Sequence, residues 1–170
     1  MWENYATHER LLTELFEGFE GEKDCRILDA GSGRTSLYFL TNRFPNSRIT
    51  AIVYPGDLRK ADSIRKFVPH ANYVLKEIDV GNLDKNEKFD IVLAHLLLGE
   101  AALFGNTFGD VLSSLFSISS EYLAIVDVLE DSDVDYRAIL RAIGSKGSLA
   151  KTVFLDRYIG FLVASRQQKP

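Results

Sequence analysis

The 170-residue sequence predicts an α/β domain built on a doubly wound, largely parallel sheet. Two observations lead to this prediction. Five short apolar runs, each typical of a buried strand, alternate with amphipathic stretches of helical length. Two further strand-like runs, residues 152–155 and 158–164, lie too close together for a helical crossover, so we expect them to pair as an antiparallel hairpin. The predicted sheet therefore has seven strands, with the hairpin at one edge.

The expected elements follow in chain order. Apolar residues at helical spacing predict a first helix over residues 3–18, which ends at Gly18 and Gly21. The five alternating strands are expected at residues 25–28, 48–54, 71–78, 89–94 and 122–128. The helices between them are expected at residues 35–44, 57–68, 95–119 (with breaks near Gly105 and Gly109) and 134–143, closed by Gly144. Pro45 and Pro69 each stop the helix that precedes them.

Composition limits the classes of protein that the chain can belong to. Its single cysteine excludes an intramolecular disulfide and a cysteine-cluster zinc site, and its three scattered histidines lack metal-ligand spacing, so we expect no metal. A net charge of -4 gives no strong nucleic-acid signature. The sequence contains neither a secretory signal nor an apolar run of membrane-spanning length, so we expect a cytoplasmic protein without a membrane partner. Residues 1–170 are expected to form one domain, with an N-terminal helix in 1–22 and the core in 23–170.

A glycine turn joins the first strand to the helix that follows it. Residues 29–33 read Asp-Ala-Gly-Ser-Gly, and glycines allow a tight turn and a close backbone approach to a ligand. A dinucleotide fingerprint would place its third glycine at position 36, where the chain has Ser36. Asp29 suits a ligand with an ammonium group, or else ties down the turn's own N–H groups. We expect a branched side chain at Gly31 to fill the space that a ligand needs and to leave the fold intact.

Residues 28–33, Leu-Asp-Ala-Gly-Ser-Gly, resemble the first motif of class I S-adenosylmethionine-dependent methyltransferases. The resemblance runs from about residue 25 to 166, and segments 88–94 and 158–164 are similar to the family's fourth and closing strands. It implies a Rossmann-like sheet of order 3-2-1-4-5-7-6, with strand 7 antiparallel. It also implies S-adenosylmethionine as cofactor, S-adenosylhomocysteine as product, and a lid over the cofactor formed by residues 1–22.

The resemblance assigns cofactor-binding positions residue by residue. These positions are Asp29, Gly31, Ser32, Gly33, Tyr54, Asp57, Asp79 and Val80. Asp79 corresponds to the acid beside the adenine amine, and the alternative is an aspartate that caps its own turn. The family's acid at the end of the second strand, which binds the ribose hydroxyls, corresponds to Val53, which can accept no hydrogen bond. We therefore expect weak cofactor binding unless Asp57, four residues on, takes that role.

His95 follows the predicted fourth strand, whose end lines the methyl-transfer site in this family. Its unperturbed pKa near neutrality suits a base, if the acceptor must lose a proton. The alternative is a histidine bonded to backbone at a strand end. The sequence thus leads to a methyltransferase whose acceptor can be a small molecule, RNA or protein. A catalytically degenerate methyltransferase-like binding or interaction protein is the alternative, favoured by Val53 and by Thr35 in place of the motif's frequent third glycine.

Overall fold

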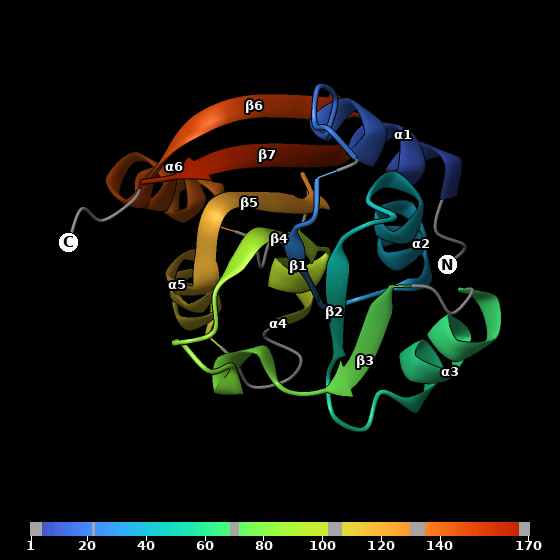
Figure 1. Ribbon diagram of the computed structural model, residues 1–170. Helices are drawn as coiled ribbons and strands as arrows, with labels where there is room; N and C mark the ends of the chain where they lie inside the picture. Colours follow the sequence, from blue (N-terminus) through green and yellow to red (C-terminus); the bar gives the residue numbers. More distant parts are fainter. Residues whose placement is uncertain (1–4, 22, 69–71, 102–106, 130–134, 167–170) are drawn as a thin grey trace.

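One seven-stranded sheet organises the computed structural model, which describes residues 5–21, 23–68, 72–101, 107–129 and 135–166. Its order is β3-β2-β1-β4-β5-β7-β6 (Figure 1). The strands are β1 (Arg26–Ala30), β2 (Arg48–Val53), β3 (Tyr73–Glu77), β4 (Phe89–His95), β5 (Ser119–Val128), β6 (Gly147–Leu155) and β7 (Tyr158–Ser165). Strand β7 runs antiparallel to both of its neighbours, β5 and β6, and the other described pairings are parallel. The predicted fold class, strand order and C-terminal hairpin are confirmed.

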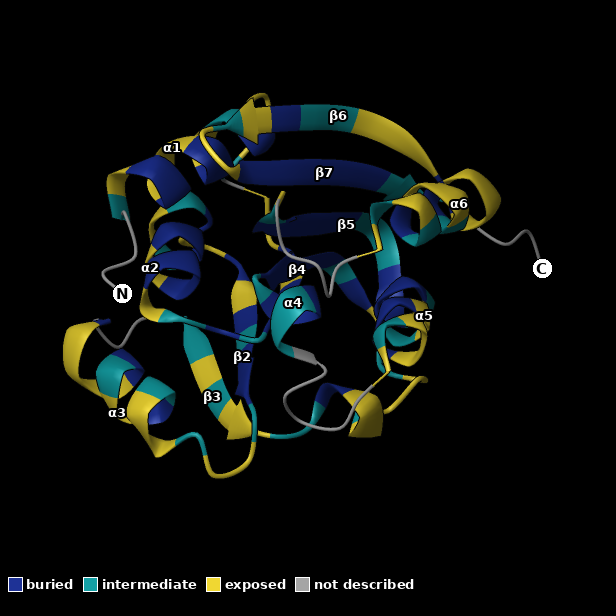
Figure 2. Cartoon of the chain, turned by 180° about the vertical axis from the view of Figure 1, so that it is seen from behind, coloured by how far each residue is buried: buried dark blue, intermediate teal, exposed yellow. Residues whose placement is uncertain are grey.

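Helices cover both faces of the sheet. They are α1 (Tyr5–Leu15), α2 (Arg34–Arg43), α3 (Leu58–Phe67), α4 (Leu97–Ala101), α5 (Phe108–Ile118) and α6 (Tyr136–Lys146), with a 3-10 helix, η1 (Val80–Asn82). Helices α1 to α3 pack on one face and η1 with α4 to α6 on the other, each over its own apolar cluster. Consecutive side chains of a strand point to opposite faces of the sheet. In β1, Ile27 belongs to one apolar cluster and Leu28 to the other. The central strands are therefore buried on both faces, as Figure 2 shows in dark blue.

Several element boundaries differ from the sequence-based expectation, among them the end of α1 at Leu15 and the start of β5 at Ser119. Strand β6 begins at Gly147 rather than at residue 152. A Cβ at Gly147 would lie 2.6 Å from Val163 Cγ1, so the glycine lets β6 approach β7 closely. Helix α6 continues through Gly144 to Lys146, so the expected end at Gly144 is wrong. Helix α5 begins at Phe108, so a helix boundary lies near Gly109, as expected. The break expected near Gly105 lies outside the described residues.

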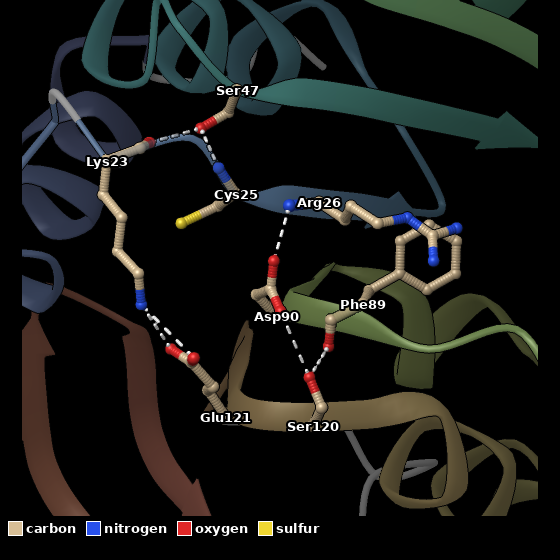
Figure 3. Close-up of polar contacts among 8 residues, drawn as sticks. All are labelled: Lys23, Cys25, Arg26, Ser47, Phe89, Asp90, Ser120 and Glu121. Carbon is tan, nitrogen blue, oxygen red and sulfur yellow. Dashed lines mark hydrogen bonds and ion pairs between the residues drawn. The ribbon is translucent and has the colours of Figure 1, made fainter.

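Polar contacts join the beginnings of β1, β4 and β5 (Figure 3). Asp90 Oδ2 accepts a hydrogen bond from the backbone N–H of Arg26 at 2.7 Å. Ser120 Oγ donates to the backbone carbonyl of Phe89 at 2.9 Å. These contacts fix the three strands at their amino ends and leave the opposite edge, where the strands end, to position a ligand site.

Helix α1 packs against β6, β7 and α2. Leu11, Leu12 and Leu15 of α1 are completely buried. A Cβ at Gly160 of β7 would lie 3.1 Å from Leu11 Cδ2, so a larger residue there would push the helix away. The N-terminal helix is thus part of the core, and its role as a lid stays a prediction. Within the described part of the chain, we find no helix with the length and apolar character that a membrane crossing requires.

Candidate functional site

A pocket lies at the carboxyl ends of β1 and β2, between α3 and α4. Its cavity volume is about 30 Å³, and it is partly open to solvent. Its lining consists of Gly31, Ile52, Val53, Tyr54, Asp57, Lys60, Ile78, Val80, Leu97 and Glu100. Four of the predicted site residues, Gly31, Tyr54, Asp57 and Val80, are therefore brought together here. The other predicted residues, Asp29, Ser32, Gly33, Asp79 and His95, do not line it.

The glycine turn forms the floor of this region. Gly31 has a φ of +71°, a left-handed conformation that favours glycine. The backbone N–H of Ser32 donates to the carbonyl of Ile52 at 2.7 Å and so ties the turn to β2. Gly33 is the N-cap residue of α2, and a Cβ added to it would meet no atom of the described structure within 4 Å. Open space therefore lies in front of the amino end of α2.

Asp29 is completely buried beneath the turn. Its Oδ2 accepts hydrogen bonds from Ser32 Oγ at 2.5 Å and from Ser36 Oγ at 2.8 Å. Its Oδ1 is buried and has no hydrogen-bond partner among the described residues. Burial raises the pKa of Asp29 to about 6, against the opposing effect of the two serine hydroxyls. A buried carboxylate oxygen without a donor is costly, so this oxygen marks a place where a ligand N–H group, directly or through a water molecule, would stabilise the site.

Leu97 faces Gly31 from α4. An ideal Cβ on Gly31 would lie 2.9 Å from Leu97 Cδ1 and 3.2 Å from Leu97 Cβ. The preceding residue, Leu96, has a φ of 56°, a strained value for a leucine at the junction of β4 and α4. The expectation that a branched side chain at Gly31 leaves the fold intact is therefore wrong, because a packed leucine and an unfavourable φ oppose it.

An ion pair that the sequence did not reveal crosses the pocket. Lys60 Nζ of α3 lies 2.6 Å from Glu100 Oε2 of α4, and both side chains are about one-third exposed. Lys60 belongs to a basic stretch of α3 that also contains Arg59, Arg65 and Lys66. The available signal was its position in the first turn of α3, because the first turn of a helix that follows a parallel strand lies at the strand's carboxyl end.

The acidic residues near β2 and β3 have structural partners. Asp57 is the N-cap of α3, and its Oδ1 accepts from the backbone N–H of Lys60 at 3.1 Å. Asp79 caps η1, and its Oδ1 accepts from the backbone N–H of Gly81 at 2.8 Å. Val53, at the end of β2, is 1% exposed and belongs to the apolar cluster under α1 to α3.

His95 lies at the end of β4 and packs against the first helix. Its Nε2 is 2.8 Å from Nδ1 of His8, so its partner is a side chain of α1 rather than backbone. The ring of His8 in turn contacts the ring of Tyr158, with centroids 4.3 Å apart. Burial, followed by the charges of His8 and Lys60, lowers the pKa of His95 to about 3. The imidazole is therefore neutral at pH 7.

Comparison with known proteins gives a match in structure but not in sequence. No family model matches the chain, and no curated protein matches its sequence. Solved structures do match it, at TM-scores near 0.7. The N-methyltransferase NodS from Bradyrhizobium japonicum WM9, in complex with S-adenosylhomocysteine, has a TM-score of 0.72 at 10% identity, covering 95% of this chain and 87% of NodS.

Two further enzymes give the same picture. Magnesium protoporphyrin IX methyltransferase from Synechocystis PCC 6803, with bound S-adenosylmethionine, has a TM-score of 0.72 at 13% identity, over 95% of this chain and 79% of that one. A 1,6-didemethyltoxoflavin-N1-methyltransferase from Burkholderia thailandensis has a TM-score of 0.70 at 15% identity, over 98% and 81%. At such identities the likeness concerns the fold.

Proposed function

Because the chain has the fold of class I S-adenosylmethionine-dependent methyltransferases, we propose that it binds S-adenosylmethionine in this pocket and catalyses methyl transfer. The observation that carries the proposal is the glycine turn. It combines a left-handed Gly31, open space before Gly33, and the buried Asp29 Oδ1 that has no donor among the described residues. S-adenosylhomocysteine is then the product.

The pocket residues fit the parts of this cofactor. Ile52, Ile78 and Val80 provide an apolar surface that suits the adenine ring. The turn, with Asp29 beneath it, suits the amino-acid end, whose ammonium group can supply the missing donor. The polar side chains that line the pocket, Tyr54, Asp57, Lys60 and Glu100, surround the space left for the ribose.

Methyl transfer requires no covalent intermediate between the protein and the methyl group. The bound cofactor supplies an already activated methyl group on its sulfonium. The residues of the pocket hold and orient it, and alignment with the acceptor supplies most of the acceleration. A proton-accepting base is needed only where the acceptor must lose a proton. We assign His95 no proton transfer, because the side chain is buried and its Nε2 contacts His8. The acceptor can be a small molecule, RNA or protein.

Calorimetric titration tests the cofactor assignment. We expect S-adenosylhomocysteine to bind and NAD not to bind. Gly33→Val is expected to weaken S-adenosylhomocysteine binding about tenfold or more, because the branched side chain would enter the open space before α2. The fold should persist, because Gly33 has an extended backbone conformation and its Cβ would meet nothing within 4 Å.

Gly144→Val is the matched control. A Cβ at Gly144 also meets nothing within 4 Å, and none of the described residues of α6 lines the pocket. This variant should bind S-adenosylhomocysteine as the parent does. Binding of NAD without binding of S-adenosylhomocysteine would overturn the proposal, and equal binding by the parent and Gly33→Val would refute the placement of the ligand at the turn.

A further inference from the structure

The ribose of the proposed cofactor presents two hydroxyl donors, which need acceptors once they leave water. Val53, at the end of β2, offers none. We propose that Glu100 of α4, held in place by Lys60 of α3, accepts the hydrogen bonds of these hydroxyls. This inference rests on the proposed function and adds to it a binding residue and a positioning residue.

Glu100 is the carboxylate best placed for this role among those that line the pocket. Among the residues that the structure describes, the lining contains two acids, Asp57 and Glu100. Asp57 is committed to the fold, because its Oδ1 caps α3 at the N–H of Lys60. In the described structure, Glu100 accepts a hydrogen bond from Lys60 through Oε2 alone. A carboxylate has about four acceptor positions, so Glu100 can still accept a hydrogen bond from each ribose hydroxyl.

The surroundings hold Glu100 over the pocket. Asp127 Oδ2 accepts from the backbone N–H groups of Leu98 at 3.1 Å and Gly99 at 3.2 Å, which anchors α4 to the end of β5. Lys60 Nζ then fixes the carboxylate from the other side of the pocket, at 2.6 Å. A charged hydrogen bond at this distance restricts the rotamers of Glu100. The acceptor is thus positioned before a ligand arrives.

The test varies the protein and the ligand together. Parent, Glu100→Gln and Lys60→Met are titrated with S-adenosylhomocysteine and with its 2′,3′-dideoxy analogue. Glu100→Gln is expected to lose about ten- to a hundredfold in affinity for S-adenosylhomocysteine, the effect of losing a charged hydrogen bond. Its affinity for the dideoxy analogue should match that of the parent. Lys60→Met should show a smaller loss, also confined to the ligand that carries the hydroxyls.

Glu121→Gln provides a control for the loss of a half-exposed, ion-paired glutamate. Glu121 pairs with Lys23 at 3.0 Å at the amino ends of the strands, away from the pocket (Figure 3). This variant should bind both ligands as the parent does.

Each remaining outcome has a defined meaning. If the parent binds no S-adenosylhomocysteine, the proposed function fails. If the parent prefers the ribose ligand and Glu100→Gln keeps that preference, the assignment of Glu100 alone fails. A hydroxyl-dependent loss in Asp57→Asn, with none in Glu100→Gln, would give the role to Asp57. Tighter binding by Glu100→Gln would mean that the ion pair closes the pocket, and it would also overturn the inference.

Discussion

Gly31→Ala is expected to lower the free energy of unfolding by about 2–5 kcal/mol, measured by urea denaturation. Two costs add. A left-handed φ of +71° costs an alanine about 1–2 kcal/mol. The new methyl group would also lie 2.9 Å from Leu97 Cδ1, and such overpacking costs about 1–3 kcal/mol. A side chain at this position therefore destabilises the turn, whatever ligand the pocket takes.

Gly56→Ala separates the two costs. Gly56 has a φ of +86°, and a Cβ there would meet nothing within 4 Å. This variant should lose only the conformational part, about 1–2 kcal/mol. Equal losses in Gly31→Ala and Gly56→Ala would contradict the contact with Leu97. A double-mutant cycle of Gly31→Ala with Leu97→Ala should show coupling, because the shorter side chain at position 97 makes room for the new methyl group.

Acidification is expected to destabilise the fold through His95. Its folded-state pKa of about 3 lies below the ordinary value of 6.5, so the unfolded chain binds the proton more readily. The stability that the neutral, buried imidazole contributes is present above pH 6.5 and is lost as the pH falls toward 3. Between pH 7 and pH 5 the loss amounts to about 2 kcal/mol.

Asp29 opposes this effect. Its pKa rises from 3.8 to about 6 on folding, so the folded state binds the proton more readily and gains stability as the pH falls through that range. The gain between pH 7 and pH 5 is about 1 kcal/mol. The effects of His95 and Asp29 on stability between pH 7 and pH 5 therefore partly cancel in the parent. Single variants are needed to measure each effect by itself.

Urea titrations of His95→Gln and Asp29→Asn at pH 7 and pH 5 provide this separation. The stability difference between the parent and His95→Gln should change by about 2 kcal/mol over this interval, in favour of the variant at pH 5. Asp29→Asn should lose more stability than the parent on acidification, because it lacks the opposing titration. If the difference in unfolding free energy between the parent and His95→Gln is the same at pH 7 and pH 5, the pKa assigned to this imidazole is contradicted.

Local pattern predicted most of the fold. Strands β1, β2, β4 and β5 lie within apolar, often β-branched runs, and the short gap between Leu155 and Tyr158 predicted the hairpin. The first half of β6, residues 147–151, escaped prediction, because Gly-Ser-Leu-Ala-Lys contains no β-branched residue. This segment is a strand because it pairs with β7, and such tertiary pairing outweighs intrinsic propensity.

The candidate site was predicted only where its residues are neighbours in sequence. The turn at residues 29–33 follows from local spacing. Contacts between distant segments do not, since Lys60 and Glu100 are 40 positions apart and His8 and His95 are 87 apart. Each of these residues has an unremarkable local context, on a polar helix face or at a strand end. Their pairing depends on the order of the strands and the path of the helices over them.

The packing of α1 sets an order of events during synthesis. Thr7 donates a hydrogen bond at 3.2 Å to Asp156, 149 positions later, and Leu11 and Leu15 lie over Gly160. At translation rates of roughly 5–20 residues per second, about 7 to 30 seconds pass between the synthesis of the helix and that of its partner strands. During that interval the part of α1 that packs on β6 and β7 has no partner, although α2 is already synthesised. Helix α1 thus completes its native packing only after the hairpin of β6 and β7 has been synthesised.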